Sequence, residues 1–200
     1  MTRTLWLVRH AATAMTGARW AGSRSDPPLN DAGRAAADAL ASALVVRLPK
    51  ETVVLASPAR RAVETARPIA AALGVAVEMD DDLREVDVGE LDGLTFDETA
   101  ARYPDLARRL LASDRDIDWP GGERVADLRA RAGTAMARLD AAGAGTVVIV
   151  SHGGVIGELI ATLAGPDAVE DLWLEAGTAV SLEREGDAWR VSERINPGPT

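Results

Sequence analysis

Two short apolar runs, each ending in a histidine, constrain the fold of this chain more than any other feature. The first run is Leu5–His10 and the second is Val147–His152, and the 200-residue sequence has two histidines in all. Apolar runs of this length are typical of buried strands. In an open α/β sheet, ligands bind outside the carboxyl ends of the strands. Both imidazoles are therefore expected at one site.

Segments with helical signals separate the apolar runs. Asn30 is a candidate N-cap, Ser57 and Pro58 form a second helix start, and Thr95 with Glu98 fits a capping box. The predicted helices cover residues 30–48, 58–74, 95–103, 106–112, 125–139 and 153–165. The predicted strands cover residues 5–10, 52–56, 75–78 and 147–152, with two more in a hairpin that turns at residues 185–187. The acidic run at residues 80–82 is predicted to be a solvated loop.

This alternation of strands and helices predicts an α/β fold. The expected architecture is a three-layer sandwich in which helices flank a mostly parallel central sheet, with an antiparallel C-terminal hairpin at the edge. The length suits one core, and no internal repeat or low-complexity linker divides the chain, so we expect a single domain over residues 1–200.

Composition excludes several classes of function. A formal net charge of -9 disfavours nucleic acid and anionic membranes as partners. The sequence has no apolar stretch long enough to span a bilayer and no signal-peptide pattern at its N-terminus. The absence of cysteine excludes disulfides and thiol chemistry and is compatible with the cytoplasmic location that we expect. Two histidines without a clustered third ligand indicate no metal site.

Arginine next to histidine points to chemistry on an anion. Arg9 precedes His10 at the end of the first predicted strand, and Arg60 follows the second helix start. A neutral imidazole can attack phosphorus and form a covalent intermediate, and guanidinium groups match phosphate oxygens with paired donors. We therefore interpret His10 as a nucleophile. One ring nitrogen would attack, and the other would donate to a neighbour such as a backbone carbonyl.

Four sequence blocks resemble the motifs of the histidine phosphatase superfamily, also called phosphoglycerate mutase-like. They are residues 9–13, 57–66, 83–93 and 151–154, and they follow one another in the family's order. Each block alone is common, but four in order are specific. The resemblance also implies a phosphohistidine on His10, with no cofactor and no metal.

The remaining site residues are assigned around this nucleophile. Arg9, Arg60 and His152 are expected to bind the phosphate, and Gly153 would let backbone N–H groups at a helix start approach it. Glu85 is interpreted as the general acid, because a leaving alkoxide needs a carboxyl group with a raised pKa. Asp87 and Glu90 are nearby alternatives for that role.

Other positions are less determined. Thr13 either binds a phosphate oxygen or shapes the loop. Thr16 stands where many relatives have a phosphate-binding Asn, and it is expected to bind the phosphate through a hydroxyl donor of shorter reach. Ala11 replaces the family's usual Gly, which is tolerated if the backbone is not left-handed there. Gly22, Ser23 and Arg24 are expected at the substrate rim. Arg61 and Arg67 are interpreted as surface side chains in salt bridges.

The expected activity is hydrolysis of a small-molecule phosphomonoester. The segment 93–121 resembles that of short phosphatases, whereas the cofactor-dependent mutases are longer and carry an insert with basic residues for a glycerate carboxylate. A phosphoglycerate mutase, a non-catalytic phosphate-binding module and a protein-phosphohistidine phosphatase stay open as alternatives. The sequence leaves the oligomeric state open, with a homodimer as one alternative.

Overall fold

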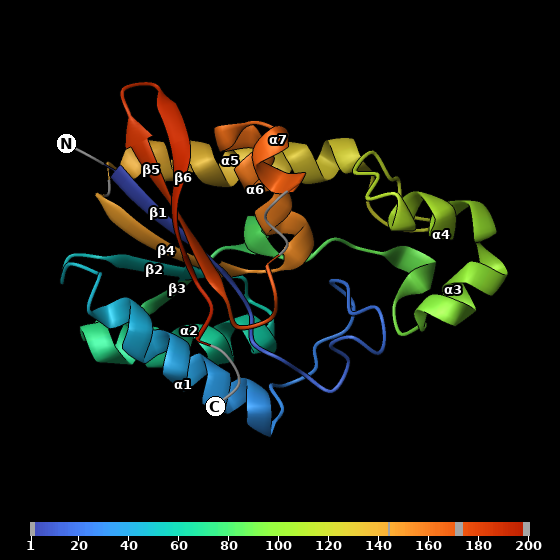
Figure 1. Ribbon diagram of the computed structural model, residues 1–200, viewed down its shortest axis with the longest axis horizontal. Coiled ribbons are helices and arrows are strands. Elements are labelled where there is room, and N and C mark those ends of the chain that lie inside the picture. The colour runs from blue at the N-terminus through green and yellow to red at the C-terminus, as the bar shows by residue number, and fades with distance from the viewer. Residues whose placement is uncertain (1–2, 144, 171–173, 198–200) are drawn as a thin grey trace.

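A six-stranded sheet lies between two layers of helices in the computed structural model, which describes residues 3–143, 145–170 and 174–197 (Figure 1). The strands are β1 (Arg3–Arg9), β2 (Val53–Ala56), β3 (Val77–Met79), β4 (Thr146–Ser151), β5 (Ala179–Glu185) and β6 (Ala188–Ile195). The helices are α1 (Asp31–Val45), α2 (Arg60–Leu73), α3 (Phe96–Arg102), α4 (Pro104–Leu111), α5 (Val125–Ala142), α6 (Gly153–Ala164) and α7 (Asp167–Glu170), with short 3₁₀ turns η1 (Asp81–Leu83) and η2 (Gly89–Leu91).

The strand order is β3-β2-β4-β1-β5-β6. The first four strands in this order are mutually parallel, while β5 runs antiparallel to β1 and β6 antiparallel to β5. The mostly parallel sheet with an antiparallel C-terminal hairpin is therefore confirmed. Because β1, β2 and β4 are parallel neighbours, their carboxyl ends meet at one edge of the sheet.

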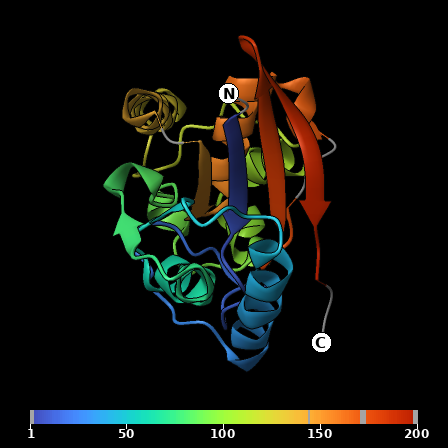
Figure 2. The same ribbon diagram turned by 90° about the vertical axis from the view of Figure 1, so that its left-hand side faces the viewer.

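The side chains of β4 show why the sheet is covered on both faces. Val147 and Ile149 pack in one core cluster with residues of α5 and α6, whereas Val148 and Val150 pack in a second with residues of α1 and α2. Successive residues of a strand point to opposite faces, so an uninterrupted apolar run requires cover on each side. Figures 1 and 2 show the two helical layers, and the predicted three-layer sandwich is confirmed.

Local capping signals locate several helix ends. The Asn30 side chain accepts a hydrogen bond from the Gly33 N–H at the start of α1, and Thr95 forms the predicted capping box with Glu98. Gly74 ends α2 in the left-handed conformation, with a φ of 73° that glycine adopts without strain. These three predicted boundaries are confirmed. Helices α3 and α4 lie beyond one end of the sheet, at the right of Figure 1.

Two predicted helix starts are wrong. Helix α2 begins at Arg60, and its N-cap is Ala59 with no side-chain cap, so Ser57 and Pro58 precede the helix. The Ser57 N–H instead extends the sheet by donating to the Val150 carbonyl, at 2.9 Å. Helix α4 begins at Pro104 itself, because proline at the first helical position has no N–H to leave unpaired.

The acidic run at residues 80–82 is more structured than the predicted solvated loop. It enters the 3₁₀ turn η1, and the Asp80 side chain accepts a hydrogen bond from the Asp82 N–H. The Arg138 guanidinium on α5 donates to both carboxylates, at 2.6 Å to Asp80 and 2.7 Å to Asp82. The run therefore attaches η1 to α5 through ion pairs.

Candidate active site

Three neighbouring strands deliver polar residues to one place. His10 follows β1, His152 follows β4 and Ser57 follows β2. The His10 N–H donates to the Ser151 carbonyl at 2.9 Å, so the strand pairing continues up to the first histidine. The two imidazole rings lie with their centroids 5.0 Å apart and their planes at 61°. The two histidines predicted to share a site are therefore brought together.

Main-chain contacts fix the tautomer of His10. Its Nδ1 lies 2.8 Å from the Ala11 carbonyl oxygen. A carbonyl can only accept, so Nδ1 carries the proton and Nε2 keeps its lone pair. The predicted hydrogen bond to a backbone carbonyl is confirmed. Burial, helped by the charges of Arg61 and Arg9, lowers the pKa of His10 from 6.5 to about 3, so the ring is neutral at physiological pH.

Ala11 is compatible with its place in this loop. Its N–H donates to the Thr65 hydroxyl at 3.0 Å. Among the residues that the structure describes, Ser113 alone has a positive φ without being glycine, so Ala11 lies outside the left-handed region. The replacement of the family's glycine is therefore free of backbone strain.

His152 is fully buried next to His10. Its Nε2 lies 2.8 Å from the Ser57 hydroxyl oxygen. Its Nδ1 is buried and has no hydrogen-bond partner among the described residues. Burial, followed by the charges of His10, Arg61, Arg131 and Arg9, lowers the pKa of His152 well below its usual value. The ring is therefore neutral and has one nitrogen available to a ligand.

Arg9 lies at the start of α6. One terminal nitrogen of its guanidinium donates to the Leu174 carbonyl at 2.7 Å. A Cβ added at Gly153 would lie 3.6 Å from the guanidinium carbon, an ordinary van der Waals distance, so the helix start and the Arg9 guanidinium are direct neighbours. Burial lowers the pKa of Arg9, while the nearby Glu85 and Glu175 raise it.

The adjacent residues Arg60 and Arg61 have opposite environments. The Arg60 side chain is 60% exposed, and its Nε donates to Glu64 on the outer face of α2 at 2.6 Å. The Arg61 side chain is 1% exposed. Its charge lowers the pKa of His10, His152 and Glu85. Arg61 therefore belongs to the cluster of polar side chains around the two histidines. The interpretation of Arg61 as a surface side chain is therefore wrong, whereas the Arg60 side chain lies at the surface, paired with Glu64.

Loop carbonyls hold the Arg61 guanidinium in place. It donates to the carbonyls of Ser25 at 2.7 Å, Gly22 at 3.2 Å and Ala21 at 3.3 Å. Its Nε is buried without a hydrogen-bond partner in the described part of the chain. Burial lowers the pKa of Arg61. The loop after β1 therefore positions a desolvated cation.

The spacing of residues along α2 distinguishes the two arginines. Arg61 precedes Thr65 by four residues and Ile69 by eight, and all three lie on the buried face of α2. Arg60 precedes Glu64 by four residues, a spacing typical of an exposed ion pair.

Glu85 lies at a cavity of about 320 Å³, which Ser23 and Arg131 also line. Its Oε1 accepts from the Val86 N–H at 2.9 Å. Burial raises the pKa of Glu85, although the Val86 N–H and the charges of Arg61, Arg9 and Arg131 oppose the rise. This is the direction that a general acid needs at neutral pH.

The two alternative acids are held in ion pairs with arginines, although Asp87 lines the same cavity as Glu85. The Arg24 guanidinium binds Asp87 through Nε at 2.8 Å. Glu90 accepts from Arg102 at 2.7 Å and from the Tyr103 hydroxyl, at the base of α3. Glu85 is therefore the carboxyl group among these three whose surroundings suit proton donation.

The remaining predicted residues lie in the loop after β1. The hydroxyls of Thr13 and Thr16 lie 3.3 Å apart, and the Thr13 N–H donates to Thr16, so both shape this turn. Gly22 packs against Val86, where a Cβ would lie 2.8 Å from the Val86 carbonyl oxygen. Ser23 lines the cavity beside Glu85, and the Arg24 guanidinium donates to the Asp87 carboxylate.

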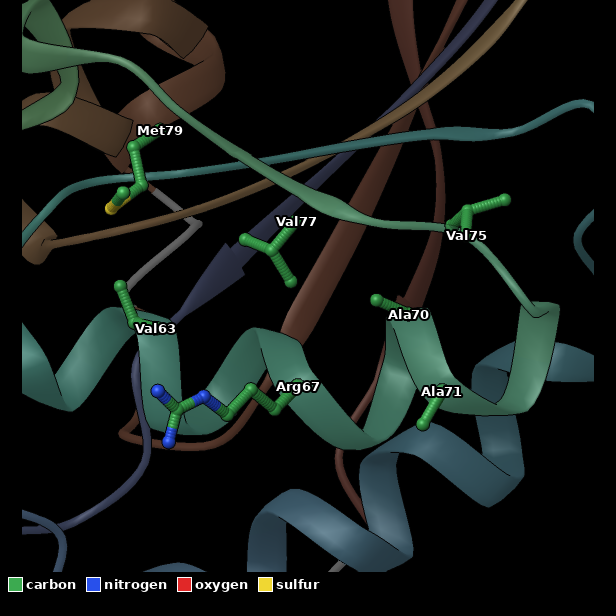
Figure 3. A pocket seen from close by; sticks show the side chains of 7 residues that line it. All are labelled: Val63, Arg67, Ala70, Ala71, Val75, Val77 and Met79. Carbon is green, nitrogen blue, oxygen red and sulfur yellow. The ribbon is translucent and has the colours of Figure 1, made fainter.

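A larger pocket lies away from the histidines. It has a volume of about 500 Å³ and lies between α2 and β3 at the edge of the sheet (Figure 3). It is lined by Val63, Arg67, Ala70, Ala71, Val75, Val77 and Met79. None of the predicted site residues is in this lining, so it is not the candidate active site.

Neither a metal-ligand group nor a membrane-spanning helix is found in the part of the chain that the structure describes. No group of three or more His, Asp or Glu side chains there is placed to hold a metal ion. No helix among the described residues is both long and apolar enough to cross a bilayer.

Three residues beside the two histidines are not predicted from the sequence. The patterns predict Arg61 at the surface and Ser57 as a helix cap, and they give no role to Thr65, which accepts from the Ala11 N–H. Periodicity on α2 contained the signal for Arg61 and Thr65. Ser57 gave no such signal, because its partner His152 is 95 residues away in the chain.

Several known proteins are similar to this chain in sequence or in fold. A bifunctional protein of Mycobacterium tuberculosis is 41% identical over 150 residues, which are 74% of this chain but 40% of that relative's length. Phosphoglycerate mutase-like protein 4 of Arabidopsis thaliana is 36% identical over 195 residues, 92% of this chain and 81% of the relative. The structure of a mycobacterial glucosyl-3-phosphoglycerate phosphatase in complex with VO3 superposes with a TM-score of 0.84 at 31% identity, covering 95% of this chain and 97% of that one. The family model of the histidine phosphatase superfamily (branch 1) matches residues 5–197. The chain belongs to the histidine phosphatase superfamily.

Proposed function

We propose that this protein is a metal-independent phosphomonoester hydrolase that acts through a phosphohistidine on His10. The observation that carries the proposal is the ring of His10, which is neutral and donates through Nδ1 to the Ala11 carbonyl. This leaves the Nε2 lone pair to attack phosphorus. The bond from phosphorus to the ester oxygen breaks as the N–P bond forms. A water molecule then attacks phosphorus, releasing inorganic phosphate and restoring the neutral ring.

Three groups are proposed to bind the phosphoryl oxygens. Arg9 and Arg61 supply positive charge, and the His152 Nδ1 supplies a further contact. Arg61 takes the role expected for Arg60, because Arg61 is buried in the cluster and Arg60 is bonded to Glu64 at the surface. Guanidinium donors in a desolvated site are worth far more than in water. Backbone N–H groups at the start of α6, beyond Gly153, add the positive end of a helix dipole.

Glu85 is proposed to protonate the leaving oxygen. Its raised pKa keeps the carboxyl group protonated to higher pH than an exposed glutamate. The proton lost to the leaving alkoxide is regained from the attacking water in the second step.

The segment between Gly93 and Gly121 favours hydrolysis over mutase activity. Its arginines are bound by carboxylates of the chain itself: Arg102 by Glu90, Arg108 by Asp105, Arg109 by Asp114 and Arg115 by Glu158. They are therefore engaged rather than presented to a substrate carboxylate. The mutase-like relative keeps phosphoglycerate mutase as a second candidate. A small-molecule phosphomonoester substrate, a homodimer and a cytoplasmic location stay predictions.

Hydrolysis of p-nitrophenyl phosphate in EDTA tests the proposal. Wild type and His10→Ala would be compared over about pH 5 to 8, the range that suits a histidine nucleophile. We expect turnover in wild type and its loss in His10→Ala. Acid-labile phosphate trapped on His10 by rapid quenching would identify the intermediate. Turnover that survives His10→Ala would contradict the assignment of the nucleophile.

The alternatives give different results. A mutase would interconvert 3- and 2-phosphoglycerate in the presence of 2,3-bisphosphoglycerate. A non-catalytic module would bind inorganic phosphate without turning over any of a broad panel of phosphomonoesters.

A further inference from the structure

The hydroxyl of Ser57 lies 2.8 Å from Nε2 of His152, on the ring that follows β4. We propose that the Ser57 hydroxyl donates to Nε2 of His152 and thereby fixes the Nδ1–H tautomer, which makes His152 a neutral hydrogen-bond donor to the phosphoryl group. Ser57 is thus a positioning residue that acts through His152. The identity of the ligand rests on the proposed function, whereas the tautomer does not.

The hydrogen-bonding capacity of Ser57 leads to this direction of donation. Its Oγ has two neighbours within hydrogen-bond distance, the Ala59 N–H at 3.3 Å and the His152 Nε2 at 2.8 Å. The amide can only donate, so it occupies a lone pair of the hydroxyl. Among the described residues, Nε2 of His152 is then the acceptor that remains for the hydroxyl proton. With Nε2 accepting, the single proton of a neutral ring lies on Nδ1.

The opposite arrangement leaves one more group unsatisfied, the hydroxyl of Ser57. If Nε2 donated to Ser57, the buried hydroxyl proton would have no acceptor in the described part of the chain. The unpartnered Nδ1 would then present a lone pair instead of an N–H. A lone pair repels the oxygens of a phosphoryl group, whereas an N–H binds them. The geometry therefore favours the tautomer that suits an anion.

The tautomer matters because the ring is neutral. A charged imidazolium would donate from both nitrogens, and Ser57 could then not determine which nitrogen carries the proton. Burial disfavours this charged form of His152, and the neighbouring cations Arg9, Arg61 and Arg131 disfavour it further. The positive charge of the site thus comes from arginine, and His152 contributes a directed donor.

The fold holds Ser57 in this position. Its main chain continues β2 through the hydrogen bond from its N–H to the Val150 carbonyl, next to the strand that carries His152. The side chain is fully buried. Engagement with His152 also accounts for the absence of a serine cap on α2.

Nitrogen-15 NMR of the histidine rings tests the tautomer directly. The chain has two histidines, so a histidine-labelled sample gives two ring systems, and the His10→Gln variant assigns them. Wild type is expected to show His152 protonated on Nδ1 at about pH 7. Ser57→Ala is expected to move the proton to Nε2, and Ser57→Thr to keep it on Nδ1.

Ser151→Ala is the matched control. Ser151 is also fully buried and precedes His152, but its hydroxyl donates to the Leu83 carbonyl at 2.8 Å. It should leave the tautomer of His152 unchanged. Binding of inorganic phosphate by calorimetry should weaken about 10- to 100-fold in Ser57→Ala and no more than about threefold in Ser151→Ala.

A wild-type ring protonated on Nε2 would overturn the proposal without any variant, so loss of folding in Ser57→Ala cannot obscure the result. An unchanged tautomer in folded Ser57→Ala would overturn it as well. Failure to hydrolyse phosphomonoesters, with the tautomer as expected, would instead remove the proposed function and leave the role of Ser57 intact.

Discussion

The floor of the candidate site and the helical cap of α3 and α4 use the same residue type in opposite ways. At the floor, Arg61 is buried and Arg9 is half-buried, and both donate to main-chain carbonyls. In the cap, Arg102 and Arg109 lie at the surface and bind carboxylates. A positive charge that is shielded from water interacts strongly with a nearby anion, whereas an exposed ion pair is screened by solvent and contributes little. The environment of an arginine, more than its presence, therefore decides whether it can act on an anion.

Removing the proposed general acid should reduce activity more than any other substitution considered below. Glu85→Gln is expected to lower kcat/KM for alkyl phosphates by about 10²- to 10⁴-fold, because a poor leaving group needs a proton. The loss should be much smaller for p-nitrophenyl phosphate, whose leaving group needs little help. Glu90→Gln, at the base of the cap, is the control and should retain activity. Equal losses for both substrates would contradict the role.

The pH profile should report the same carboxyl group. Because burial raises the pKa of Glu85, wild-type activity on alkyl phosphates should be present below that pKa and decline as pH rises through it. The Glu85→Gln variant should lack this alkaline decline. A decline that persists in the variant would assign it to another group.

Arg61 and Arg60 give the sharpest pairwise comparison. Arg61→Ala is expected to lower kcat/KM by about 10²- to 10³-fold, through loss of a desolvated donor. Arg60→Ala should stay within about threefold of wild type, because an exposed ion pair with Glu64 contributes little. Circular dichroism would show that both variants fold. Equal effects of the two substitutions would contradict the assignment of Arg61 to the site.

Glycine substitutions on two helices test the packing behind Glu85. A Cβ on Gly154 would lie 2.8 Å from the Glu85 Oε1 and 2.6 Å from a methyl carbon of Val86. Gly154→Ala should therefore displace the acid and lower activity on alkyl phosphates about tenfold. Gly133 on α5 has no heavy atom within 4 Å of such a Cβ. Gly133→Ala should keep activity and raise the free energy of unfolding by about 1 kcal/mol.

The neutral ring of His10 should make the free energy of unfolding depend on pH. Its folded pKa of about 3 lies below the ordinary value of 6.5, so the unfolded chain binds more protons between these limits. The stability from His10 is thus present above pH 6.5 and lost as pH falls toward 3, by about 1.4 kcal/mol per pH unit. Denaturant unfolding of wild type and His10→Gln from pH 7 to pH 4 measures this. Parallel curves would contradict the low pKa.

The cap should show the smallest effect. Arg102→Gln removes an ion pair with Glu90 whose side chains are both about half exposed. We expect kcat/KM within about threefold of wild type and no measurable change in Tm, because exposed pairs contribute little. A large rise in KM would show that the cap binds substrate and would narrow the contrast with the floor.

Short-range patterns predict most of the helices and strands and the meeting of the two histidines. Apolar runs located the strands, and caps such as Asn30 and Thr95 located helix starts. His10 and His152 were placed together because parallel strands end at one edge. The starts of α2 and α4 were missed. At α2 the reason is physical: a serine that resembles a cap is bonded instead to a residue distant in the chain.

The sequence by itself determined the alternation of strands and helices, the position of both histidines at strand ends, and the family to which the chain belongs. The tertiary structure alone decided that the buried face of α2 packs beside His10, where Thr65 accepts from the Ala11 N–H, that Glu85 lies half-buried at a cavity, and that Ser57 meets His152. Periodicity and capping act within a few residues. Strand order, the rotation of α2 against the sheet and the burial of a charge depend on contacts between distant segments, which no local pattern records.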